Sequence, residues 1–170
     1  AGENNEAGPE THTHMAFSGD ELAGVVDLFG ALSRGELGEA LAELAYKQGE
    51  EYDPGAFDAE IAAAVEGYHL VELDARVAST DEAVLVPGPG AFPTVPAGGP
   101  DLTHILDIER RELDRATAGE AVLDRFRRDA AAAVDSGDPG RVERLLDVSY
   151  ELEAWADVDL SAERDLLDRV

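Results

Sequence analysis

Residues 87–100, PGPGAFPTVPAGGP, constrain the fold more than any other stretch of this chain. They hold five of its eight prolines together with four glycines, a composition that excludes a helix and disfavours a continuing strand. Because the stretch lies between two periodic regions, it divides the 170 residues into two parts. We expect one unit over residues 18–92, a Pro/Gly linker over residues 93–100 and a second unit over residues 101–170. The polar residues 1–17 are expected to form a disordered tail.

Two consecutive capping-box patterns begin the first unit. In each, a serine is followed three residues later by a glutamate, at Ser18 and Glu21 and again at Ser33 and Glu36. Apolar residues then recur at spacings of three and four, which is the period of an amphipathic helix. The sequence therefore predicts two helices, over about residues 19–32 and 34–48, joined by a very short turn.

A third helix and a hairpin complete the first unit. Asp53 followed by Pro54 is typical of a helix start, and Gly67 of its end. The period then changes to that of strands. Residues 69–73 and 76–78 predict one strand or two short ones, and residues 83–86 predict a returning strand. Three helices followed by a β-hairpin is the order of a winged helix-turn-helix domain.

The second unit is expected to be entirely helical. Its apolar spacing predicts helices over about residues 101–116, 118–135 and 139–155 and a short last helix capped by Ser161, with Thr117 and Glu120 as a further capping box. The second and third of these should pair as an antiparallel hairpin across a tight Gly-Asp-Pro turn. The fold class is thus mainly α (α+β): a winged helix-turn-helix followed by an α-helical hairpin or bundle.

The charge of the chain indicates the solvent in which it folds. Acidic residues outnumber basic ones by 38 to 13, for a formal net charge of −25, and Lys47 is the only lysine beside twelve arginines. Such self-repulsion destabilises a compact chain in dilute buffer and is screened at molar salt. The composition resembles that of cytoplasmic proteins of salt-in haloarchaea, with an acidic mesophilic protein or a DNA mimic as alternatives. We expect folding to depend on salt.

The segment FSGDELAGVVDLFGALSRGELGEALAELAYKQG, residues 17–49, is the basis of a family resemblance. It resembles the start of an uncharacterised haloarchaeal protein family with a winged-helix-like N-terminal domain and a helical C-terminal half. The resemblance covers about residues 17–92 and continues more weakly beyond them. It carries no catalytic motif, so it implies a fold and a lineage.

A winged-helix domain would read DNA through the helix of residues 53–67. This segment contains four acidic residues and no Lys, Arg, Asn or Gln, whereas base readout relies on Arg, Asn or Gln. We therefore expect a cytoplasmic, non-enzymatic regulatory or interaction module that acts through protein–protein contacts. A winged-helix DNA-binding transcription regulator is the alternative.

Two groups of residues in the second unit are candidate contact sites. Six arginines could contact a nucleic acid or another anion: Arg110, Arg111, Arg115, Arg125, Arg127 and Arg128. Acidic residues alternate with them, so an ion-paired surface or an oligomer interface is the alternative. One side of the helix of residues 139–155 could contact a protein partner or a second copy of the chain, in a homodimer, through Leu145, Leu146, Leu152 and Trp155.

The sequence contains no recognisable motif for catalysis or cofactor binding. It lacks a P-loop, a G-x-G-x-x-G after a strand, H-E-x-x-H and G-x-S-x-G. His12 and His14 form an H-x-H pair in the expected tail, and His69 and His104 fit structural or surface positions. There is no cysteine, and no apolar run reaches the ~20 residues of a membrane span. We expect no enzymatic activity, cofactor, metal or membrane contact.

Overall fold

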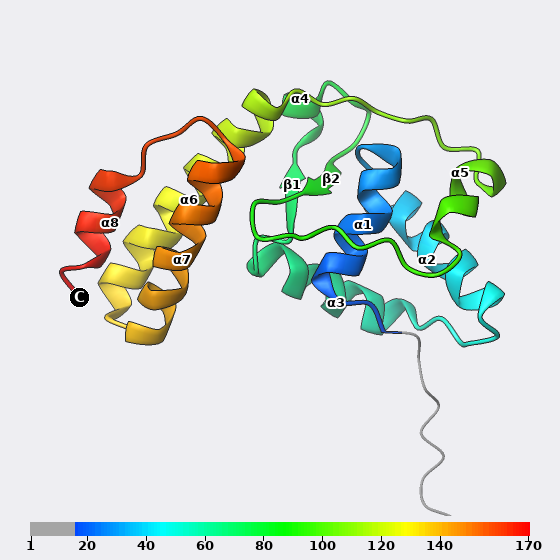
Figure 1. Cartoon of the computed structure of the whole chain (residues 1–170), viewed down its shortest axis with the longest axis horizontal. Helices are drawn as coiled ribbons and strands as arrows, with labels where there is room; N and C mark the ends of the chain where they lie inside the picture. The colour runs from blue at the N-terminus through cyan, green and yellow to red at the C-terminus, as the bar shows by residue number, and fades with distance from the viewer. Residues whose placement is uncertain (1–15) are drawn as a thin grey trace, which may run out of the picture.

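The computed structural model describes residues 16–170 and confirms a mainly helical fold with one small antiparallel sheet (Figure 1). The first part of the chain forms α1 (Gly19–Phe29), α2 (Arg34–Lys47), α3 (Pro54–Glu66), β1 (Leu70–Leu73), α4 (Ala75–Ala78) and β2 (Val84–Pro87). The second part forms the 3₁₀ turn η1 (Gly99–Asp101), α5 (Leu102–Ile105), α6 (Arg115–Ser136), α7 (Pro139–Trp155) and α8 (Ser161–Leu167). The expected tail falls outside the described residues except at its end, where Phe17 is buried in the core of α1, α2 and α3.

Both predicted capping boxes are present, and they fix where α1 and α2 begin. The hydroxyl of Ser18 accepts a hydrogen bond from the N–H of Glu21 at 3.2 Å, while the Glu21 carboxylate accepts one from the N–H of Ser18 at 3.1 Å. Ser33 and Glu36 make the same exchange at 3.1 and 2.9 Å. These bonds satisfy backbone N–H groups that a helix start leaves without partners.

The β-hairpin is buried on both faces. β1 pairs with β2 in antiparallel register, with Leu70 opposite Pro87 and Leu73 opposite Val84. Leu70 and Leu85 belong to a core that α1, α2 and α3 form. The alternate positions belong to a second core, shared with α6, α7 and α8: Val71, Leu73, Val84 and Val86. Since strand side chains alternate between faces, this one hairpin joins the two cores.

The connection between the strands contains a helical turn where the sequence predicted a strand. Residues 76–78 lie in α4 instead. Asp74 caps this turn, because its carboxylate accepts a hydrogen bond from the N–H of Val77 at 2.8 Å. The turn ends at Ser79, which has a left-handed backbone with φ of 55°. The local capping bond outweighs the strand propensity of the valine.

The helix predicted over residues 101–116 is wrong. Only Leu102–Ile105 forms α5, and residues 106–114 reach α6 without regular structure. The apolar side chains that suggested a helix pack into the core of α1, α2 and α3 instead: Leu102, Leu106 and Ile108. Asp114, rather than Thr117, caps α6, its carboxylate accepting from the N–H of Ala116 at 3.1 Å. Tertiary burial has overridden a local helical period.

Residues 88–98, which we call the strap, pack along α1 rather than serving as a free linker. The N–H of Thr94 donates to the carbonyl of Asp20 at 3.0 Å, and the N–H of Phe92 donates to the Asp20 carboxylate at 2.9 Å. A β-carbon on Gly24 of α1 would lie 2.1 Å from the Thr94 carbonyl oxygen, so this close approach requires glycine. Figure 1 shows the strap, in green, crossing α1 between β2 and α5.

The antiparallel hairpin predicted for the second part is present as α6 and α7. Gly137, with φ of 64°, ends α6, and the carboxylate of Asp138 caps α7 immediately before Pro139. The start of α3 uses the same arrangement, with Asp53 before Pro54. Proline has a backbone angle suited to a first helical position and lacks an N–H that would need a partner there.

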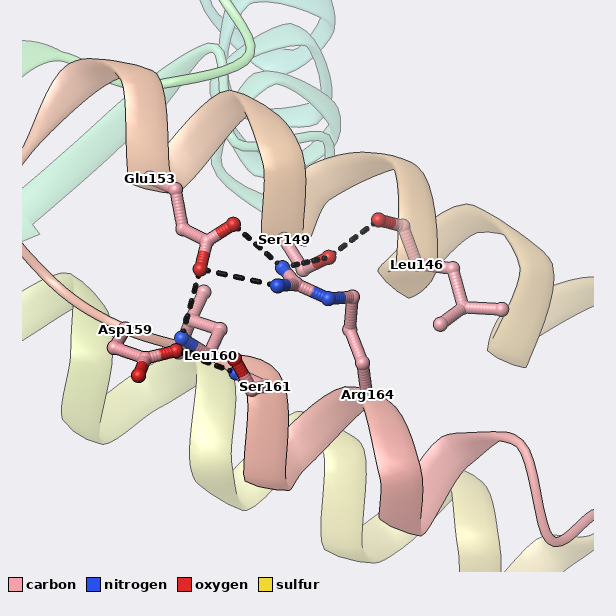
Figure 2. A network of polar contacts seen from close by, with 7 residues as sticks. All are labelled: Leu146, Ser149, Glu153, Asp159, Leu160, Ser161 and Arg164. Atoms are coloured by element: carbon pink, nitrogen blue, oxygen red, sulfur yellow. Dashed lines mark hydrogen bonds and ion pairs between the residues drawn. The ribbon is translucent and has the colours of Figure 1, made fainter.

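A bidentate ion pair fixes α8 against α7 (Figure 2). The two terminal nitrogens of Arg164 lie 2.6 and 3.2 Å from the two carboxylate oxygens of Glu153. Glu153 also accepts a hydrogen bond from the N–H of Leu160 at 3.0 Å. Ser161 is the first residue of α8 rather than its cap, and the carboxylate of Asp159 accepts from its N–H at 3.0 Å.

Candidate functional site

Arginines of the second part cap the C-terminal end of α1. The last turn of α1 has no basic residue, although a helix end presents unpaired carbonyls with partial negative charge. Arg110 Nη1 lies 3.4 Å from the carbonyl oxygen of Leu28, and Arg111 Nη1 donates to the carbonyl of Ala31 at 3.2 Å. Gly30, with φ of 79°, allows this approach, because a β-carbon there would lie 1.8 Å from the Arg111 carbonyl oxygen.

α6 holds the C-terminal end of α3 in a similar way. The last turn of α3 also lacks a basic residue, and Arg125 Nη2 donates to the carbonyl of Glu66 at 3.2 Å. The guanidinium of Arg125 lies 3.9 Å from the ring centroid of Tyr68, within the range of a cation–π contact. The Tyr68 hydroxyl donates to the carboxylate of Asp129 at 2.5 Å. Burial and this carboxylate raise the pKa of Tyr68.

Tyr68 adopts a left-handed backbone conformation that residues with a β-carbon rarely adopt. Its φ is 62°, in the left-handed region, where a residue with a β-carbon costs about 1–2 kcal/mol. The side chain is buried, and its ring lies 6.4 Å from that of Phe126 on α6, centroid to centroid. The contacts that Tyr68 makes with α6 offset this local cost.

A cleft of about 520 Å³ opens where the end of α1, the strap, the start of α6 and the end of α7 meet. Arg110, Arg111 and Arg115 line it together with Trp155. Arg115 Nη1 donates to the carbonyl of Trp155 at 3.2 Å, and the Arg115 guanidinium lies 4.9 Å from the ring centroid of Trp155. The cleft thus unites four residues that the sequence analysis had assigned to two different surfaces.

Two of the three arginines keep donors available to a ligand in the cleft. Arg111 is not available to a ligand, because its two terminal nitrogens donate to the Glu36 carboxylate at 2.6 and 3.3 Å. Arg110 and Arg115 each donate to one carbonyl, whereas a guanidinium has five N–H donors. Their remaining donors suit a carboxylate or phosphate. The other charged residues of the cleft are acidic, and apolar side chains complete its walls: Asp27 and Glu112, then Val86, Ala91, Leu113 and Ala118.

The other three arginines of the predicted contact site do not lie in the cleft with Arg110, Arg111 and Arg115. Arg125, on α6, contacts the C-terminal end of α3. Arg127 Nε lies 3.0 Å from a carboxylate oxygen of Glu163 on α8. Arg128 is exposed and lines a separate hollow beside β1, together with Asp124. Ion pairing and helix capping therefore account for most of this group.

Two further arginines, Arg141 and Arg144, were missed by the sequence analysis. Together with Arg125 they line a hollow of about 400 Å³ at the start of α7. A sequence signal for them existed. They are three residues apart, just after the Asp-Pro that begins α7, and this spacing places two side chains on one face of a helix.

The expected interface on α7 is wrong for two of its four residues. Leu145 and Leu152 are 4% and 0% exposed because they complete the core that α6, α7 and α8 share. Leu146 and Trp155 are partly exposed. A partner could therefore contact only one edge of this predicted surface.

The histidines in the described part of the chain contribute no metal site. His69 Nδ1 lies 3.1 Å from an Asp20 carboxylate oxygen at the start of α1, and His104 is exposed on α5. Among residues 16–170, no three His, Cys, Asp or Glu side chains are arranged to hold a metal ion. The His12 and His14 pair lies outside the described residues. No helix within residues 16–170 is long and apolar enough to cross a membrane.

Comparisons with known proteins place the chain in a family. No curated protein and no solved structure gives a significant match to it. A family model does match, over residues 20–170, and this range includes the strap, the cleft and both cores except Phe17. Since the match covers most of the chain, the protein belongs to DUF7109, a family of unknown function.

Proposed function

We propose that this chain is a halophilic, non-enzymatic regulatory or interaction module that acts through protein–protein contacts. The observation that carries the proposal is the cleft lined by Arg110, Arg115 and Trp155. It has spare guanidinium donors, an aromatic side chain and apolar walls, and this combination is enriched at protein interfaces. An acidic segment of a partner protein fits this chemistry.

The rim of the cleft adds an exposed aromatic group. Phe92 is 78% exposed, although its backbone is fixed to α1 through Asp20. Its neighbours in the strap, Ala91 and Pro93, line the cleft. An aromatic side chain on a fixed backbone loses little conformational entropy when a partner covers it. Phe92 is therefore the natural contact for an apolar residue beside the acidic segment.

The composition supports the halophilic part of the proposal, to which we add a cytoplasmic location. A net charge of −25 and a single lysine suit a chain that folds where salt screens repulsion between acids. Basic residues are scarce in this chain. The guanidiniums of Arg110 and Arg115 in one cleft therefore differ in charge from the acidic surface around them, and an acidic partner segment can recognise this difference. The haloarchaeal lineage is part of this proposal.

A winged-helix DNA-binding regulator is the second candidate. Three helices followed by a hairpin support it, and so does the pairing of Leu32, between α1 and α2, with Leu85 of β2. Two observations weigh against DNA reading. The exposed positions of α3 carry only small or acidic side chains besides its proline: Gly55, Asp58, Ala59, Ala62, Ala63 and Glu66. The second face of the hairpin is covered by the core shared with α6, α7 and α8.

A photo-cross-linking experiment tests the proposal. A photoreactive phenylalanine replaces Phe92, and the chain is irradiated at molar KCl, first alone and then in an extract of a haloarchaeon. We expect a discrete cross-linked protein that Arg110→Glu with Arg115→Glu abolishes. Arg76→Glu with Arg169→Glu, a matched pair of arginines outside the cleft, should leave it intact. A product with the purified chain alone would identify a second copy as the partner.

Two results would overturn the protein-contact proposal. One is a cross-linking pattern that the cleft variant and its matched control change equally. The other is sequence-selective, salt-tolerant binding of duplex DNA, measured by fluorescence anisotropy at molar KCl, which would favour the DNA-binding candidate.

A further inference from the structure

A second concentration of positive charge lies apart from the cleft, at the hollow of about 400 Å³ beside the start of α7. Arg125 reaches it from α6, and Arg141 and Arg144 reach it from α7. Glu66, the last residue of α3, and Tyr68, two residues after it, also line the hollow. Three of the twelve arginines thus surround one hollow in a chain with 38 acidic residues.

Two of the three carboxylates that line the hollow, Asp129 and Asp138, are already engaged, and the third, Glu66, is exposed at the end of α3. Asp129 accepts the hydroxyl of Tyr68 at 2.5 Å and lies 3.4 Å from Arg125 Nε. Asp138 accepts hydrogen bonds from the N–H groups of Gly140 and Arg141 as the cap of α7. Their oxygens therefore neutralise Arg125 and the helix start rather than the two arginines of α7.

Guanidinium donors in the hollow remain without partners. Within residues 16–170, neither Arg141 nor Arg144 has a carboxylate oxygen within 4.0 Å. Arg125 Nη1 is buried and has no hydrogen-bond partner in the same part of the chain. Arg141 also lies in the first turn of α7, where the helix dipole disfavours a cation. A bound anion would remove each of these costs.

We propose that this hollow binds the phosphate group of a small ligand. Three carboxylates line the hollow with the three arginines, but neither Arg141 nor Arg144 has one of their oxygens within 4.0 Å. A phosphate, which carries about −1.5 to −2 at pH 7, supplies the anionic oxygens that these two guanidiniums lack. Guanidinium groups hold phosphate oxygens in paired hydrogen bonds. The volume exceeds that of the anion alone, which favours a phosphate monoester over free phosphate. The site is separate from the cleft, and the proposal does not depend on the proposed function.

Titration calorimetry tests this site with two probes, inorganic phosphate and glycerol 3-phosphate. Ionic strength is held constant with KCl at a concentration at which the chain is folded. We expect saturable binding, at least tenfold weaker in Arg141→Gln with Arg144→Gln, and tighter binding of the monoester than of inorganic phosphate. Arg76→Gln with Arg169→Gln lowers the net positive charge equally at exposed positions away from the hollow, and should bind as the unmodified chain does.

Two outcomes would overturn the proposed site. The first is that neither probe binds saturably. The second is that both double variants lose affinity equally, which would indicate a general charge effect. Far-ultraviolet circular dichroism checks that each variant is folded. If the glutamine variant is not folded, Arg141→Lys with Arg144→Lys replaces it. This variant keeps the charge but removes the paired donors, and unchanged affinity would also contradict the proposal.

Discussion

Arg111 Nη1 lies 2.6 Å from Oε1 of Glu36, the same oxygen that accepts the N–H of Ser33 in the capping box of α2. One carboxylate therefore completes a local helix start and anchors a segment that lies far away in the sequence. The second carboxylate oxygen of Glu36 accepts from Arg111 Nη2 at 3.3 Å. This pair helps to hold residues 106–114, together with the N–H of Arg111, which donates to the carbonyl of Phe29 at 2.8 Å.

We predict that Glu36→Gln weakens the fold in a pH-dependent way. Burial raises the pKa of Glu36, but the hydrogen bonds from Arg111 and from the N–H of Ser33 outweigh burial, and the net pKa is lowered. A lowered folded-state pKa stabilises the fold above the unfolded value of 4.5, and this stabilisation disappears as the pH falls through the folded value. Urea unfolding should show the variant about 1 kcal/mol less stable at pH 7, with the difference shrinking below pH 4.5. A difference that is independent of pH would contradict this role.

Gly30→Ala should be among the most damaging small substitutions in the chain. Its φ of 79° disfavours a side chain, and the new β-carbon would lie 1.8 Å from a backbone oxygen of Arg111. We expect a loss of about 3 kcal/mol or more, measured by urea unfolding. Gly49→Ala is the matched control, because φ is 68° there but nothing lies within 4 Å. It should cost only about 1 kcal/mol, and equal losses at the two positions would contradict the close approach.

Tyr68→Phe isolates the hydrogen bond to Asp129 from the packing of the ring. The hydroxyl is lost while the contact with Phe126 stays, so we expect about 1–2 kcal/mol of destabilisation. Tyr46→Phe is the control, since Tyr46 is 80% exposed and should change stability by less than about 0.5 kcal/mol. Thermal unfolding followed by circular dichroism measures both. Equal stability of the two variants would mean that the buried bond contributes nothing.

The chain should unfold at a lower temperature as KCl is removed. Within residues 16–170 only a few acidic side chains pair with a base. The excess of acidic over basic residues in the chain gives the net charge of −25. At molar salt the Debye length is about 3 Å, whereas at 0.01 M it is about 30 Å and repulsion acts across the molecule. We expect an increase of many degrees in the melting temperature between dilute and molar KCl. A melting temperature independent of KCl would contradict the halophilic proposal.

Local chemistry made much of the fold predictable. The capping boxes at Ser18 and Ser33 and the Asp-Pro start at Asp53 are determined by residues within one helical turn, so the sequence alone locates them. The segment of residues 106–114 was not predictable in this way. Leu102 and Leu106 have helical spacing, but the burial of Leu106 and Ile108 in the core of α1, α2 and α3 is a tertiary event that no local pattern encodes.

The candidate sites were predictable by residue type but not by arrangement. The accumulation of arginines in the second part stands out in an acidic chain, and Arg110 and Arg115 do meet in the cleft. Both arginines also donate hydrogen bonds to carbonyls at the ends of α1 and α7. The sequence shows that α1 and α7 lack basic residues in their last turns. It does not show which distant arginine serves each of them.

The packing of Leu102, Leu106 and Ile108 into the core of α1, α2 and α3 sets an order for folding during synthesis. When the ribosome has released only the residues up to the strap, the core of α1, α2 and α3 still lacks the side chains of Leu102, Leu106 and Ile108. The pairing of Arg111 with Glu36 can form only after residue 111 has been released. A fragment cut at the Pro/Gly run, where the sequence suggests a domain boundary, would expose the apolar surface that Leu102, Leu106 and Ile108 cover. A fragment that extends through Arg111 would keep this cover and would still expose the face of the hairpin that packs on α6, α7 and α8.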